Sequence, residues 1–126
     1  MALNDGDVKS MIAREAITRH RAVKLTSTGN ARELDLADTQ GEECIGIAMD
    51  NAAAGDPIGV HVQGSLSKWE VTNVAGVTKG DELAAEADGG CGTAASADHV
   101  VALALETGAQ NDIIEVLVTP HNLALP

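Results

Sequence analysis

Short runs of alternating apolar and polar residues, separated by turn-forming residues, recur along most of the chain. Residues 21–26, 32–37 and 57–62 alternate with a period of two, the side-chain period of a strand with one buried face. Glycine, asparagine and aspartate lie between such runs and tolerate the backbone conformations of tight turns. Further candidate strands are residues 44–49, 66–71, 82–86, 99–105 and 112–118. About eight or nine short strands predict an all-β fold, a small antiparallel β-sandwich or barrel.

The apolar residues are almost all aliphatic. The chain has no Phe or Tyr and one Trp, Trp69, among 126 residues. Aromatic side chains bury the most surface per residue, so a core built without them suits thin layers of packed strands. A chain of this length buries one core, and we expect one domain. We favour Trp69 as the centre of that core over the alternative that it anchors an interface.

The first segment of the chain differs from the rest. Apolar residues form a short stripe between positions 11 and 17, and Asp7 is placed to cap a helix beginning near Val8. An isolated helix this short is marginal in water, so the segment needs the body or a partner to become ordered. We therefore predict an N-terminal extended or short-helical arm over residues 1–19 and a β body over residues 20–126.

Three turn-formers followed by an acid precede apolar runs, at residues 55–56, 80–81 and 111–112. We expect each aspartate to accept hydrogen bonds from backbone amides two residues further on and so to fix the start of a strand. The spacings of 25 and 31 residues are too unequal to indicate a repeat. Residues 50–54 are expected to form one helical turn.

Charge is unevenly distributed. The net charge is −11, yet the chain up to residue 32 carries six basic and three acidic side chains, and the remainder carries two lysines and 16 acids. Such a body repels nucleic acid and anionic lipid, and no apolar run approaches the roughly 20 residues of a membrane span. A basic leading segment suits docking onto an acidic protein surface. Pairing of these residues inside the chain is the alternative.

No constellation of catalytic or metal-binding residues emerges. Cys44 and Cys91 occur without a CxxC motif or an adjacent base, and we expect both to be buried free thiols. The four histidines lack the spacing of a metal site. No glycine-rich phosphate loop and no GxSxG nucleophile motif is present. We therefore expect no enzymatic activity, no cofactor and no metal.

One alternative function is a small β-barrel carrier or ligand-binding module. Residues 77–83 resemble the turn of lipoyl and biotinyl carrier domains, which present a modifiable lysine at a hairpin tip. The nearest stretch, residues 86–90, contains no lysine. The carrier hypothesis therefore lacks its reactive residue.

Several short segments follow one another in order along about four fifths of the chain: residues 22–23, Gly29, 44–48, 52–56, 58–64, 77–83, 102–106 and 113–118. In this order they resemble the small capsid cement, or head decoration, proteins of tailed bacteriophages. The resemblance implies a compact β-sandwich or barrel on the outer surface of the virion, made in the host cytoplasm. It also implies a structural role, stabilising contacts between major capsid protein subunits, without catalytic residues.

The resemblance also gives the N-terminal segment a role, because such proteins commonly reach onto neighbouring capsid subunits with this part of the chain. The predicted capsid-binding residues are Met11, Ile12, Arg14, Ile17, Arg19, Arg21 and Lys24. The expected partners are the major capsid protein and further copies of the same chain, with a homotrimer favoured. No nucleic acid or membrane partner is expected.

Overall fold

The computed structural model describes residues 8–26 and 32–122, and all regular structure within them is β-strand. The strands are β1 (Val8–Ala13), β2 (Ala22–Leu25), β3 (Glu33–Leu36), β4 (Gly46–Ala48), β5 (Pro57–His61), β6 (Leu66–Glu70), β7 (Glu82–Ala85), β8 (Cys91–Thr93), β9 (His99–Ala104) and β10 (Ile113–Asn122). The predicted all-β class is confirmed. In this part of the chain no helix is long and apolar enough to cross a membrane.

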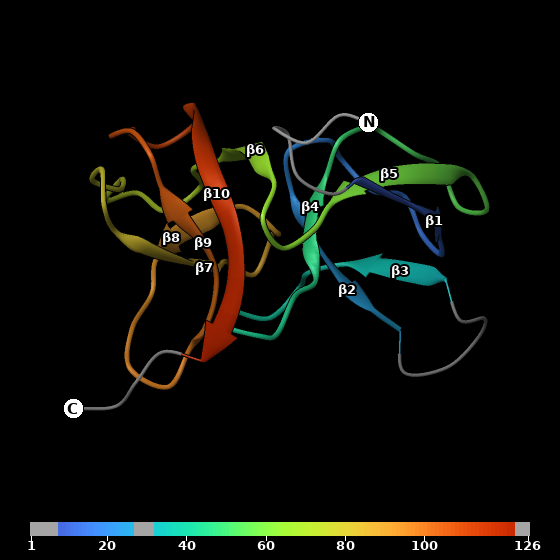
Figure 1. Ribbon diagram of the computed structural model, residues 1–126, viewed down its shortest axis with the longest axis horizontal. Coiled ribbons are helices and arrows are strands. Elements are labelled where there is room, and N and C mark those ends of the chain that lie inside the picture. Colours follow the sequence, from blue (N-terminus) through green and yellow to red (C-terminus); the bar gives the residue numbers. More distant parts are fainter. Residues whose placement is uncertain (1–7, 27–31, 123–126) are drawn as a thin grey trace.

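Strands β1 to β5 close into a barrel in the order β1-β3-β2-β4-β5, which we call the first barrel (Figure 1). Its pairings are antiparallel except for β1 with β3, which run parallel. Alternate residues of each strand point inward, as the period of two predicts. The interior is filled by Ala13, Ile17, Val23, Leu34, Ala48, Ile58 and Val60.

Strands β6 to β10 form a second five-stranded sheet in the order β6-β10-β9-β7-β8, which we call the second barrel. The ladder pairings within it are all antiparallel. A parallel bridge between Val71, just after β6, and Cys91, at the start of β8, joins the two ends of the sheet. The two barrels stand side by side in Figure 1.

The second barrel repeats the first in strand order and in register. In the first barrel Ile47 of β4 pairs with His61 of β5, and in the second Leu103 of β9 pairs with Leu117 of β10. Each partner lies 56 residues further along the chain. The parallel contact of β1 with β3 corresponds to the parallel bridge that closes the second barrel.

The repeat is also present in the sequence, so the expectation of no repeat is wrong. Residues 47–62 and 103–118 are identical at six of 16 equivalent positions. The aspartates at positions 56 and 112 occupy equivalent places, whereas the one at position 81 belongs to a different turn of the second barrel. The two unequal spacings together therefore span one repeat of 56 residues.

A recurrent turn leads into four strands, at residues 53–56, 78–81, 95–98 and 109–112. The amide of its last residue, an aspartate, donates to the carbonyl of the first, and the aspartate carboxylate accepts from the amide of the first. The third residue has a positive φ. Each carboxylate therefore binds an amide three residues before it, and the predicted direction was wrong. The predicted position at the start of a strand is confirmed.

Two helices predicted from the sequence are absent from the described residues. Residues 8–13 form β1, because hydrogen bonding to both β3 and β5 outweighs a weak helical stripe. Within residues 50–54, Ala52 exchanges two hydrogen bonds of 2.9 Å with Ile17 instead of forming a helical turn. The predicted cap Asp7 and the predicted turn at residues 27–30 lie outside the described residues.

The two barrels share one buried cluster. Trp69 of the second barrel is 0% exposed, and its Nε1 donates a 2.9 Å hydrogen bond to the Gly89 carbonyl. Ala22 and Ile47 of the first barrel belong to the same cluster as Trp69. The prediction that Trp69 lies in the core is therefore confirmed.

Candidate functional site

The outer face of β1 carries part of the predicted docking surface. Ser10, Ile12 and Arg14 are exposed and alternate with the less exposed Met11 and the buried Ala13. We call the exposed residues on and beside this strand the β1 patch; it consists of Ser10, Ile12, Arg14, Arg32 and Pro57.

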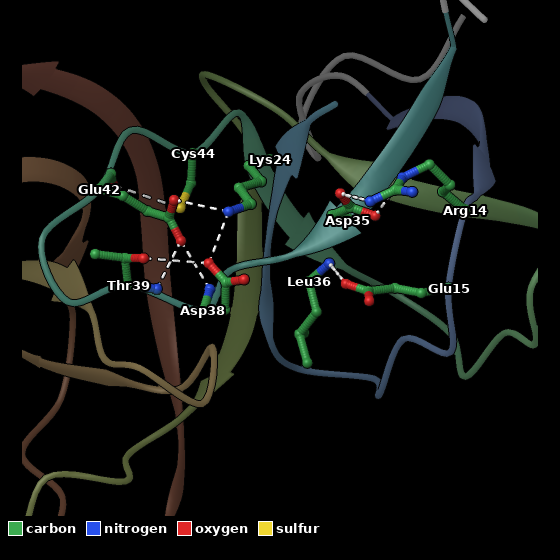
Figure 2. Close-up of polar contacts among 9 residues, drawn as sticks. All are labelled: Arg14, Glu15, Lys24, Asp35, Leu36, Asp38, Thr39, Glu42 and Cys44. Carbon is green, nitrogen blue, oxygen red and sulfur yellow. Dashed lines mark hydrogen bonds and ion pairs between the residues drawn. The ribbon is translucent and has the colours of Figure 1, made fainter. Parts of the chain in front are cut away.

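Arg14 is fixed on this face by a two-point ion pair with Asp35 of β3 (Figure 2). The Nε–Oδ1 distance is 2.9 Å and the Nη2–Oδ2 distance is 2.6 Å. The hydrogen bond and the charge of Asp35 raise the pKa of Arg14 above its usual 12.5. The guanidinium stays half exposed, so it is oriented by its partner and still accessible to another molecule.

Lys24 lies in a different environment, against the connection from β3 to β4. Its Nζ contacts Asp38 Oδ1 at 2.7 Å and Glu42 Oε1 at 3.0 Å (Figure 2). The other oxygen of Glu42 accepts from the amides of Asp38 and Thr39. The hydrogen bond to Asp38 raises the pKa of Lys24 above its usual 10.5. Lys24 therefore holds the fold of this connection.

Arg21 lies at the junction of the two barrels. Its Nε and Nη2 contact Glu70 Oε1 at 3.2 and 3.0 Å, and its Nη1 donates to the Asp88 carbonyl at 2.7 Å. Because both partners belong to the second barrel, Arg21 joins the two halves of the chain.

The structure therefore separates the seven predicted residues. Met11, Ile12 and Arg14 come together on β1, and Arg19 is exposed in the loop that follows, without an ion pair among the described residues. Ile17 is 2% exposed within the first barrel. The alternative explanation, pairing inside the chain, describes Arg14, Arg21 and Lys24.

Sequence reasoning did not select Arg32, which lies beside β1. Its Nη1 donates a 2.8 Å hydrogen bond to the Ser10 carbonyl, and its own carbonyl accepts from the Ile12 amide. The available signal was its charge, because it is the last of the six basic residues in the leading part of the chain.

The chemically reactive groups do not form a catalytic site within the described residues. Burial raises the pKa of both Cys44 and Cys91 to about 12, so these thiols stay protonated at neutral pH. No group of three or more potential metal ligands occurs in this part of the chain. Cys44 lines a hollow of about 180 Å³ together with Glu43, His99 and His121.

The segment that weakened the carrier hypothesis is part of the barrel junction. Residues 86–90 connect β7 to β8, and Gly89 within them is buried. The Gly89 carbonyl accepts from the Ala22 amide at 2.7 Å and from Trp69 Nε1. A hairpin held between two barrels does not present a free tip for modification.

Comparison with known proteins places the chain in a family. The family described as "Phage cement protein" matches residues 3–120. The chain belongs to the phage cement protein family. This cement protein is a structural virion protein located at the capsid surface.

A solved structure supports the fold of the cement protein. The head fiber gp8.5 N base of bacteriophage phi29 superposes with a TM-score of 0.70 and 12% sequence identity. The match covers 94% of this chain and 98% of that chain. At this identity the likeness shows a shared fold. No curated protein sequence matches significantly.

Proposed function

We propose that this cement protein binds the outer surface of the phage head and stabilises contacts between subunits of the major capsid protein. The observation that carries the proposal is the family match over residues 3–120. A head filled with DNA is under outward pressure, and a protein that bridges subunits raises the free energy of separating them. Many copies on one head convert modest contacts into durable attachment.

The proposed docking surface is the β1 patch together with Arg19. It combines an apolar side chain, Ile12, which is 37% exposed, with the exposed cations Arg14, Arg19 and Arg32. The 16 acids that follow residue 32 make the rest of the chain strongly negative. An acidic capsid surface would therefore attract this side of the molecule and repel the others. Residues 1–19 as a docking arm, and a homotrimer on the head, remain part of this proposal.

Point variants test the docking surface, because deleting the arm up to residue 17 removes β1 from the barrel. We expect the double variant Ile12→Glu with Arg19→Glu to bind heads lacking the protein about tenfold or more weakly than wild type, measured by co-sedimentation. The matched control is Val74→Glu with Lys79→Glu, which makes the same charge change at exposed sites of the second barrel.

Unchanged binding of the first variant would show that the docking surface lies elsewhere. A wild-type protein that binds no head would refute the proposed function itself. Decorated heads are also expected to retain their DNA to a higher temperature than bare heads, and equal release temperatures would contradict the stabilising role.

A further inference from the structure

The first barrel buries part of its outer surface against the second. Val23 and Ala48 fill its interior, so their neighbours Ala22 and Ile47, on the opposite side of the pleat, point outward. Ala22 and Ile47 are nevertheless 0% exposed, because they pack in the cluster that contains Trp69. The outer face of a barrel of this type therefore serves as a packing surface for another barrel.

The equivalent outer face of the second barrel has no such cover. Glu82 and Leu103 pair across β7 and β9, as Ala22 and Ile47 pair across β2 and β4. The row continues from Leu103 to Leu117 of β10 and on to Leu66 of β6.

We call Leu66, Leu103 and Leu117 the leucine row. Leu66 is 41% exposed, and the other two are partly exposed. Three leucines aligned across adjacent strands form a continuous apolar stripe, which is the kind of feature that marks a protein contact. In the first barrel, the positions of Leu117 and Leu103 hold His61 and the buried Ile47.

We propose that the leucine row is the contact surface for a second copy of this chain. The molecule itself shows which partner suits such a face, because one barrel covers the equivalent face of the other within the chain. A second copy supplies a further barrel in equal amount, and it is the neighbour that a decorated head brings close. Only that last point rests on the proposed function.

Electrostatics gives this contact a signature that separates it from capsid docking. Each copy carries a net charge of −11, so like charge opposes association and salt relieves the repulsion. Association through the leucine row is therefore expected to strengthen as salt is raised. Docking through the cations of the β1 patch onto an acidic capsid is expected to weaken.

Sedimentation equilibrium of the full chain over a series of protein and salt concentrations tests the proposal. We expect wild type to self-associate, more strongly at high salt. Leu66→Glu is expected to weaken association about tenfold or more, and Leu117→Ser to have the same effect without an added charge. The control Val74→Glu replaces a side chain that is 82% exposed and outside the row, and it is expected to associate as wild type does. Melting curves of each variant confirm that the monomer is folded.

A wild-type chain that stays monomeric throughout the series overturns the proposal, and so does a folded Leu66→Glu variant that associates normally. Head binding is measured in parallel. If Leu66→Glu loses head binding while wild type is monomeric in solution, the capsid covers the row and the proposal is wrong. If wild type self-associates through the row but binds no head, the proposed function fails and this inference stands.

Discussion

Carboxylates in this chain act mainly on the backbone. Glu15 accepts from the Leu36 amide and Glu106 from the Glu115 amide, and both bonds connect different segments. Acids at turns bind the amides of their own turn. The sequence showed that acids cluster at turns, but local pattern does not reveal which amide each one reaches. The large negative charge is thus partly a consequence of how the turns are built.

Two histidines are expected to titrate on opposite sides of the usual value of 6.5. Burial, aided by the charge of Arg19, lowers the pKa of His20, whereas the Thr119 carbonyl and the Glu82 carboxylate raise that of His121. NMR titration of the imidazole rings measures both directly. Two pKa values on the same side of 6.5 would contradict these environments.

The same shifts give opposite slopes of stability against pH. The contribution of His121 is fully present below pH 6.5 and is lost as pH rises through its raised folded-state pKa, because the folded state binds more protons in that window. For His20 stability is lost as pH falls from 6.5 through its lowered pKa. Denaturation of His121→Gln and His20→Asn across these windows is expected to remove one slope each; asparagine tolerates the positive φ at position 20.

At the scale of elements, periodicity located eight of the ten strands and failed where the signal was non-local or short. Each of the eight segments predicted as strands contains one of the strands β2 to β7, β9 or β10. β1 was missed because its adjacent apolar residues favoured a helix, and its parallel partner β3 is distant in sequence. β8 has only three residues. Neither pairing partners nor parallel direction follow from a local pattern.

The recurrent turn predicts opposite effects for two substitutions at equivalent places. Gly80 has a φ of 93°, and an added Cβ would meet no atom within 4 Å, so Gly80→Ala isolates backbone strain and is expected to destabilise by about 1–2 kcal/mol. Ala97 already holds a φ of 73°. Ala97→Gly is expected to stabilise by about 0.5 kcal/mol, the relieved strain exceeding the entropy lost on folding. Chemical denaturation measures both, and a less stable Ala97→Gly would contradict the argument.

At the scale of the whole molecule, the sequence indicated one body and the structure shows two equivalent barrels. The 56-residue repeat was present in the sequence but lay between motifs whose spacings looked irregular. The basic segment was correctly recognised as distinct, yet its cations could not be assigned partners. Arg21 and Lys24 meet carboxylates at least 14 positions away, which only the folded chain brings close.

Because the barrels share a cluster, they are expected to unfold in one transition. Trp69 is the only tryptophan and lies in that cluster, so its fluorescence reports on the junction, while circular dichroism reports on all strands. The two signals are expected to give the same midpoint in urea. Two separated transitions would show that each barrel is stable by itself.

The connection between the two barrels is only residues 62–65, and it looks like a convenient place to divide the gene. A fragment ending there would leave Ala22 and Ile47 facing water, and its complement would do the same to part of the surroundings of Trp69. Half-length constructs for displaying cargo on particles should therefore precipitate unless the missing half is supplied in trans. A foreign peptide is better placed at the solvent-facing bend around Gly55, where no neighbouring atom comes within 4 Å of an added side-chain carbon.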